Sequence, residues 1–249
     1  MVRQIPSQKI NWTEECNSTN DLAREFLNNN ECNDVVVFAA HKQISGRGQG
    51  SNKWCSDDYK NITCSIIIKP VNILMHEQFY ISMITSLAAR ELLLLHNITS
   101  TIKWPNDIYV NNNKIGGILI EHNIIGSYVT NSIIGIGFNI NQSTFPDTIP
   151  NPTSLYNELK NTFNVEEELS ILVNFFNKWL TLLNSGEKEM IYNEYLRSLF
   201  GFNEWRNFKA DNTVFSGKII NVETTGEIKI IDKKNNTNGY FFKEIEFII

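Results

Sequence analysis

The chain has 249 residues, of which 42% are hydrophobic and 11% aromatic, so it can bury a substantial core. Its formal net charge of -5 at pH 7 excludes the strongly basic balance that is typical of nucleic-acid-binding proteins. The apolar runs are too short to cross a bilayer, and the first residues do not resemble a secretory signal. The four cysteines form no CxxC pair, which favours reduced thiols and a cytoplasmic protein.

The first part of the chain predicts strands and two helices. Ser18 followed by Asp21 is close to a capping box and predicts a helix that runs to about Leu27. The β-branched, apolar runs at 35–40 and 62–68 predict buried strands, and Pro70 ends the second one. Residues 78–95 contain neither proline nor glycine and repeat apolar side chains at helical spacing, which predicts a long helix.

The second part predicts more strands, two helices and a β-rich tail. Strands are expected at 101–110, 115–121 and 133–140, and helices at 166–183 and 187–200. The turn-rich residues 111–114 suggest a hairpin in which Gly117 lies opposite Asp107. From residue 208 onward, short β-rich runs at 214–222, 227–231 and 240–242 are separated by turns. We therefore expect an α+β fold with a domain at 1–203 and a small all-β domain at 204–249.

A glycine-rich segment, residues 43–54, is the first candidate for a site. Its glycines allow a close approach of the backbone to a ligand. Arg47 and Lys53 offer cations suited to a carboxylate or phosphate, and Trp54 offers a flat surface. The spacing matches neither the P-loop nor the dinucleotide-binding fingerprint. An ordinary flexible surface loop is the alternative interpretation.

Two further segments place polar groups beside irregular strands. Pro105 cannot donate to a sheet ladder, so it must lie at a bulge, an edge or a strand end, with Lys103, Asn106 and Asp107 around it. The alternative is a solvated Lys–Asp pair beside a turn. Gly116 and Gly117 interrupt a β-branched run, which suits a ligand or another backbone lying against them. A β-bulge is the alternative there.

Taken in order, these motifs resemble those of the biotin–protein ligases. The resemblance is carried by Ser18-Thr-Asn, Gln43 with residues 46–49, Lys53-Trp54, Lys103-Trp-Pro-Asn-Asp, Lys114 with Gly116-Gly117, and residues 135–139. It is clear from about residue 10 to 142. It implies a class II synthetase-like catalytic domain, a mixed sheet backed by helices, followed by a small SH3-like β-barrel. Since only about 17 residues precede the first motif, we expect the short form without an N-terminal DNA-binding domain, and no nucleic-acid partner.

The resemblance also implies an activity and a set of site residues. The family activates biotin with ATP and Mg²⁺ to biotinyl-5'-AMP and transfers it to a lysine of a biotin carboxyl carrier protein, a domain or subunit of a carboxylase. Catalytic roles fall on Arg47, Lys103, Asp107 and Lys114. Biotin-binding roles fall on Ser18, Thr19, Asn20, Gln43, Gly46, Arg47, Gly48, Gln49, Lys114 and Gly117. ATP-binding roles fall on Asn52, Lys53, Trp54, Lys103, Asn106 and Asn139, and no protein metal site is expected.

These roles have physical sense, and two alternatives stay open. Arg47, Lys103 and Lys114 would converge to offset the repulsion between the biotin carboxylate and the ATP phosphates. Many relatives carry further arginines after Arg47, where this chain has Gln49 and Asn52, so the hold on the adenylate is in question. The alternatives are a lipoate ligase or octanoyl transferase, and a non-catalytic biotin sensor. Relatives include both monomers and homodimers.

Overall fold

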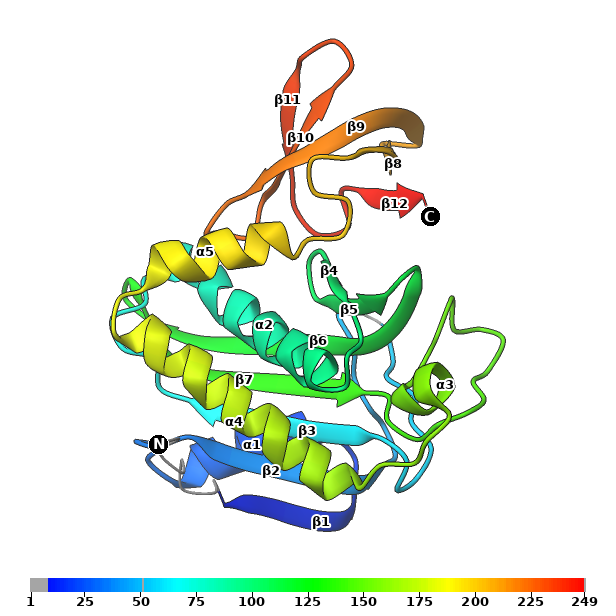
Figure 1. Cartoon of the computed structure of the whole chain (residues 1–249). Coiled ribbons are helices and arrows are strands. Elements are labelled where there is room, and N and C mark those ends of the chain that lie inside the picture. The colour runs from blue at the N-terminus through cyan, green and yellow to red at the C-terminus, as the bar shows by residue number, and fades with distance from the viewer. Residues whose placement is uncertain (1–8, 51, 249) are drawn as a thin grey trace.

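A computed structural model of the chain describes residues 9–50 and 52–248 (Figure 1). Its larger part is built on a seven-stranded mixed sheet of order β1-β2-β3-β7-β6-β5-β4. The strands are β1 (Ile10–Cys16), β2 (Val36–Gln43), β3 (Ile62–Ile68), β4 (Thr101–Lys103), β5 (Asp107–Val110), β6 (Asn113–Ile125) and β7 (Tyr128–Phe138). The β1–β2 pair is parallel and the other pairs are antiparallel, so the predicted mixed sheet is confirmed.

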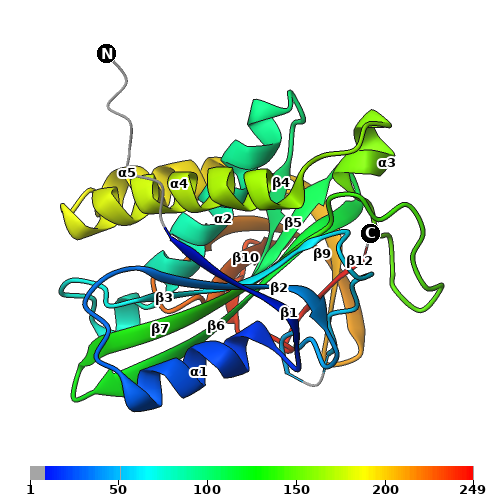
Figure 2. The ribbon, with the colours of Figure 1, turned by 90° about the horizontal axis from the view of Figure 1, so that it is seen from below.

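Helices cover both faces of this sheet. They are α1 (Thr19–Asn29), the 3-10 helix η1 (Met75–Glu77), α2 (Phe79–Leu95), α3 (Leu155–Leu159), α4 (Val165–Asn184) and α5 (Lys188–Arg197). Figure 2 shows α2 and α4 on one face and α1 on the other. The α2 helix is apolar on most sides because it lies between the sheet, α4 and α5. None of the described helices is both long and apolar enough to cross a membrane.

The tail forms a second, antiparallel sheet, as predicted. Its strands are β8 (Trp205–Ala210), β9 (Thr213–Val222), β10 (Ile228–Asp232), β11 (Thr237–Tyr240) and β12 (Glu246–Ile248), in the order β11-β10-β9-β8-β12. Phe208, Ile219 and Ile228 form its buried core. The tail is fixed to the larger part by the Trp104 indole, whose Nε1 donates to the Gly226 carbonyl at 2.9 Å. The domain boundary at residue 204 stays a prediction, because Phe202 forms a bridge to Ile219 across it.

Several local predictions need correction. The expected strand at 101–110 is two strands, β4 and β5, which fold back on each other around the cis Trp104–Pro105 peptide. Pro105 therefore lies in the turn between these two strands. Ser18 is the N-cap residue of α1, but its side chain makes no capping hydrogen bond to any described residue, so no capping box forms. Strand β1 was not predicted, because its sequence is largely polar.

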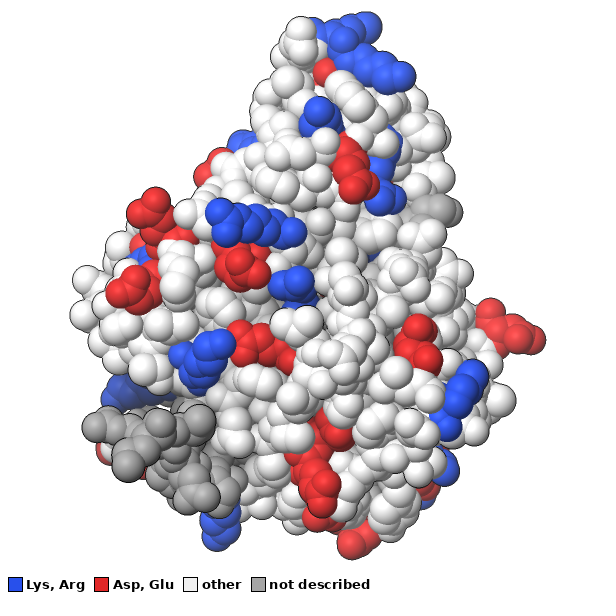
Figure 3. Space-filling view, viewed as in Figure 1, with Lys and Arg blue, Asp and Glu red and all other residues white. Residues whose placement is uncertain are grey.

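Charged side chains are spread over the surface. Figure 3 shows acidic and basic side chains interspersed on the viewed face, with basic side chains at the tip of the β10–β11 hairpin. This agrees with the modest net charge of -5.

Candidate functional site

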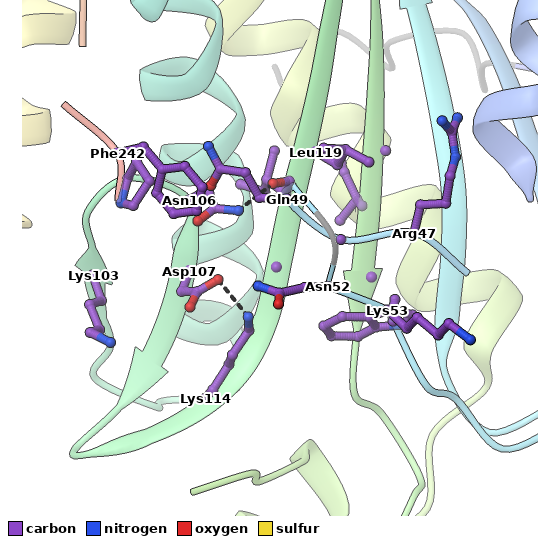
Figure 4. A pocket seen from close by; sticks show the side chains of 18 of the residues that line it. Arg47, Gln49, Asn52, Lys53, Lys103, Asn106, Asp107, Lys114, Leu119 and Phe242 are labelled. Carbon is purple, nitrogen blue, oxygen red and sulfur yellow. Dashed lines mark hydrogen bonds and ion pairs between the residues drawn. The ribbon is translucent and has the colours of Figure 1, made fainter. Parts of the chain in front are cut away.

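A cavity of about 590 Å³ lies where the larger part meets the tail (Figure 4). Its walls come from the start of α1, the glycine-rich loop 43–54, the strands β4 to β7 and the last strand of the tail. The structure brings most predicted site residues together in this lining: Ser18, Thr19, Asn20, Gln43, Arg47, Gly48, Gln49, Asn52, Lys53, Trp54, Lys103, Asn106, Asp107, Lys114 and Gly117. The full lining extends from Ser18 to Ile248, so segments near both ends of the described chain contribute to one site.

One end of the cavity is polar and uncharged. The Gln43 Oε1 atom accepts a hydrogen bond from the backbone N–H of Thr19 at 2.8 Å. The Asn20 Oδ1 atom accepts one from the Ser65 hydroxyl at 2.6 Å. The Gln43 oxygen already accepts a hydrogen bond from Thr19. The Nε2 group of Gln43 is therefore left to donate to a ligand. This end is suited to a neutral ligand that both donates and accepts hydrogen bonds.

The floor of the cavity is made by two glycines. Gly117 on β6 pairs with Gly137 on β7, and it also pairs with Asp107 on β5, as the predicted hairpin requires. A Cβ atom on Gly137 would lie 2.2 Å from the Trp54 indole, and one on Gly117 would lie 3.2 Å from it. The space that we predicted for a ligand beside Asp107 is therefore covered by an indole in this structure.

The neighbouring Gly116 has a different explanation. A Cβ atom there would lie 2.6 Å from the Phe138 ring, so core packing, and not a ligand, requires this glycine. The pairing of β5 with β6 also shifts register between Ile108 and Tyr109. The β-bulge that was the alternative interpretation is therefore present beside the site.

The opposite end of the cavity is cationic. The Lys114 ammonium forms an ion pair with Asp107 at 2.6 Å. The Lys103 ammonium lies 3.3 Å from the Tyr109 hydroxyl and 5.5 Å from the centroid of the Phe247 ring. Burial lowers the pKa of Lys103, and nearby Lys114 lowers it further, while Asp107 raises it. Burial also raises the pKa of Tyr109 to about 12, so its hydroxyl stays protonated. An anion entering here would meet the ammonium groups of Lys103 and Lys114 and the carboxylates of Asp107 and Glu246.

Arg47 does not join these two lysines. Its guanidinium lies 2.9 Å from Asp21 and 3.3 Å from Glu121. Figure 4 shows its side chain pointing away from Lys103 and Lys114. The structure therefore brings Lys103 and Lys114 together, while Arg47 lines the same cavity with its guanidinium directed to carboxylates at the rim. The physical reason is that two carboxylates, on α1 and β6, hold the guanidinium at the rim.

Two of the predicted site residues, Asn139 and Gly46, lie outside the lining. The Asn139 side chain is 4% exposed and donates to the Thr153 carbonyl at 2.9 Å, so its amide serves the fold. Gly46 lines a neighbouring cavity of about 470 Å³ beside the loop, and a Cβ atom there would lie 2.4 Å from the Trp54 carbonyl oxygen. Residues 49–52 replace the further arginines that many relatives carry after Arg47. Of these residues, Ser51 lies outside the part of the chain that the structure describes.

The structure adds residues that motif reasoning missed. The tail supplies a wall made of Phe242, Ile245, Glu246, Phe247 and Ile248. Tyr109 lies beside Lys103, and Ser65 lies behind Asn20. Tyr109 comes two residues after Asp107 on β5, and alternate residues of a strand face the same side of the sheet. This spacing is the sequence signal that could have predicted Tyr109 in the site. The tail residues carry no local motif.

Comparisons with known proteins identify a family and named relatives. Residues 12–139 match the model of the biotin/lipoate A/B protein ligase family. The bifunctional ligase/repressor BirA of Bacillus spizizenii is 34% identical over 149 residues, which cover 59% of this chain and 45% of BirA. The biotin–[acetyl-CoA-carboxylase] ligase of Paracoccus denitrificans is 28% identical over 165 residues, which cover 63% of this chain and 68% of that protein.

Solved structures agree in fold. The biotin protein ligase of Aquifex aeolicus, in complex with biotin and ATP, superimposes with a TM-score of 0.78 at 21% identity, covering 96% of this chain and 97% of that one. The chain nevertheless spans only about half the length of the BirA proteins that it matches. Because the matched residues 12–139 make up just over half of its length, the chain belongs to the biotin/lipoate A/B protein ligase family.

Proposed function

We propose that this chain uses ATP to activate biotin as biotinyl-5'-AMP and then transfers the biotinyl group to a lysine of a biotin carboxyl carrier protein. Named relatives in Paracoccus and Mycobacterium are biotin–[acetyl-CoA-carboxylase] ligases, which supports a carboxylase domain as the acceptor. The observation that carries the proposal is the polarity of one cavity. It has neutral hydrogen-bonding groups at one end and the ammonium groups of Lys103 and Lys114 at the other.

This polarity matches the two chemical parts of biotin. The ureido ring is uncharged and both donates and accepts hydrogen bonds, which suits Asn20 and Gln43. The carboxylate lies at the other end of the molecule and would reach Lys114. In the first step a carboxylate oxygen attacks the α-phosphorus of ATP, the bond to the β-phosphate breaks and pyrophosphate leaves. Lys103 and Lys114 would lower the repulsion between the two anions and stabilise the developing charge.

The second step transfers the acyl group. The acceptor lysine's amine attacks the carbonyl carbon of the mixed anhydride, a nitrogen–carbon bond forms and AMP leaves. The amine must lose a proton in this step, and Asp107 is the carboxylate in the cavity lining beside Lys114 that would orient or accept it. The described residues of the glycine-rich loop line one side of the cavity, where they would limit access of water to the anhydride.

Magnesium would enter with ATP as part of the substrate. Within residues 9–50 and 52–248, no three His, Cys, Asp or Glu side chains stand together as metal ligands. Lys103 and Lys114, two of the lysines that line the cavity, would bind the ATP phosphates from the protein side. A cytoplasmic location, where ATP and carboxylases occur, belongs to the proposal.

The test is an incubation with ATP labelled at the α-phosphate, biotin and an isolated carrier domain. Labelled AMP, pyrophosphate and a biotinylated carrier are expected, with no product on a carrier whose acceptor lysine is replaced by arginine. Preferential use of lipoate or octanoate would instead identify an acyl ligase of the other branch of the family. Tight biotin binding without adenylate or carrier product would identify a sensor.

A further inference from the structure

The Glu121 carboxylate accepts hydrogen bonds from three side chains. Glu121 lies on β6, and its side chain is 32% exposed. Its Oε2 atom accepts from the Asn20 amide nitrogen at 2.8 Å, and its Oε1 atom accepts from the Arg24 guanidinium at 2.6 Å. The Arg47 guanidinium reaches both oxygens, at 3.4 and 3.3 Å. Glu121 does not line the main cavity described above.

The first contact fixes the orientation of a cavity side chain. Asn20 is 3% exposed, and its Oδ1 atom accepts from the Ser65 hydroxyl at 2.6 Å. An ionised carboxylate can only accept hydrogen bonds, so the nitrogen of the Asn20 amide must face Glu121 and its oxygen must face Ser65. Gly135 leaves the space for this arrangement, since a Cβ atom there would lie 2.4 Å from the Asn20 oxygen. The amide is thus held from three sides.

The hydrogen bonds continue beyond Asn20 to Gln43. Ser65 lies within hydrogen-bonding distance of both Asn20 and Thr19, at 2.6 and 2.7 Å. The Thr19 hydroxyl in turn donates to the Gln43 Oε1 atom at 3.2 Å. Gln43 is then held through the backbone N–H of Thr19. A chain of hydrogen bonds therefore joins Glu121 to the neutral end of the cavity.

The other contact fixes the glycine-rich loop. Arg47 is the arginine of that loop, and its guanidinium pairs with Glu121 and with Asp21. Asp21 also accepts from Arg24 at 2.9 Å. Two carboxylates and two guanidinium groups form a compact network at the rim of the site, and such networks are stronger than isolated surface pairs.

We propose that Glu121 is a positioning residue, which sets the Asn20 amide for biotin and, through Arg47, holds the glycine-rich loop beside the same end of the cavity. This inference rests on the proposed function and adds a residue outside the lining to it. Replacing Glu121 by glutamine keeps the shape but removes the charge and turns one acceptor into a donor. The Asn20 amide then has no carboxylate that fixes its orientation. Asp21 is the carboxylate that remains paired with Arg47.

The expected effect is a selective loss of biotin affinity. In Glu121→Gln the Kd for biotin, measured by titration calorimetry without ATP, should rise about tenfold, as for the loss of one charge-assisted hydrogen bond. The KM for biotin should rise with it, whereas the KM for ATP should change less than about twofold. Glu121→Asp, which keeps the charge on a shorter side chain, should recover part of the affinity. Glu25→Gln, an exposed charge change on α1, is the matched control.

A double-mutant cycle separates positioning from general destabilisation. If Glu121 acts through Asn20, the Glu121→Gln change should have little effect once Asn20 is alanine. The biotin Kd of Asn20→Ala/Glu121→Gln should then exceed the Kd of Asn20→Ala by less than about threefold. Asp21→Asn removes contacts of Arg47 and Arg24 but not that of Asn20, so it should speed adenylate release with a smaller change in biotin Kd than Glu121→Gln.

The outcomes are distinct. A Glu121→Gln Kd within threefold of the unmodified protein, or additive effects in the cycle, would overturn the positioning role. Absence of biotin binding by the unmodified protein would instead overturn the proposed function. Thermal melting of each variant shows whether it is folded, and Glu121→Asp keeps the test valid if Glu121→Gln unfolds.

Discussion

His122 should make the fold sensitive to mild acid. It lies on β6 next to Glu121, and its Nδ1 atom is 2.8 Å from the Ser132 hydroxyl. Burial lowers the pKa of His122 from 6.5 to about 4, because the charged imidazolium loses solvation inside the protein. Above pH 6.5 the ring is neutral in both the folded and the unfolded chain. As the pH falls from 6.5 to about 4, the unfolded chain binds a proton that the folded chain does not, so stability falls.

The magnitude follows from the two pKa values. The difference is about 2.5 units, and at roughly 1.4 kcal/mol per unit the complete loss is about 3 kcal/mol. Between pH 7 and pH 5 the same relation gives a loss of about 2 kcal/mol, as an upper bound for a ring that keeps some exposure. His122→Asn can still meet Ser132 but cannot gain a charge, so it should lack this part of the loss.

The assay is equilibrium urea unfolding at pH 7 and pH 5, followed by tryptophan fluorescence. Carboxylates titrate in both proteins, so their contribution cancels when the pH effect on His122→Asn is subtracted from that on the unmodified chain. His76→Asn, which removes an exposed imidazole, is the control. If the unmodified chain and His122→Asn lose the same stability to within about 0.5 kcal/mol, the reasoning about burial is wrong.

Three further substitutions test the site. Lys114→Ala should slow adenylate formation by roughly a hundredfold, because the carboxylate loses its cation, and unchanged pyrophosphate release would refute this assignment. Asp107→Ala should slow transfer to the carrier about tenfold more than adenylation, and equal losses in the two half-reactions would remove its special role. Gly135→Ala puts a Cβ atom 2.4 Å from the Asn20 oxygen. It should weaken biotin binding about tenfold by calorimetry, and affinity within twofold of the unmodified chain would contradict the packing argument.

Sequence patterns predicted the elements whose periodicity is local. The long apolar run became α2 within one residue of the expected start, and the strand at 62–68 has the predicted bounds. The register of Gly117 opposite Asp107 could be predicted because a short turn fixes a hairpin's pairing. The strand at 101–110 was not foreseen as two, because β4 has only three residues and shows no periodicity of its own.

Sequence motifs predicted much of the cavity lining, but they missed features that depend on residues distant in the sequence. Arg47 carries the correct charge, but its direction depends on Asp21 and Glu121, which no local pattern connects to it. Asn139 lies in a matching motif, yet the nearby carbonyl of Thr153 takes its amide. The wall from the tail, such as Phe247 beside Lys103, depends on how two sheets meet.

The ion pair between Lys114 and Asp107 has a consequence for the order of events. While the two side chains are bound to each other at 2.6 Å, the Asp107 carboxylate, which we propose as the base for the acceptor amine, is masked. A ligand carboxylate or phosphate that attracts the ammonium would free Asp107 in the same movement. In the proposed reaction, this ion pair would thereby prevent Asp107 from acting as a base until an activated substrate occupies the cavity.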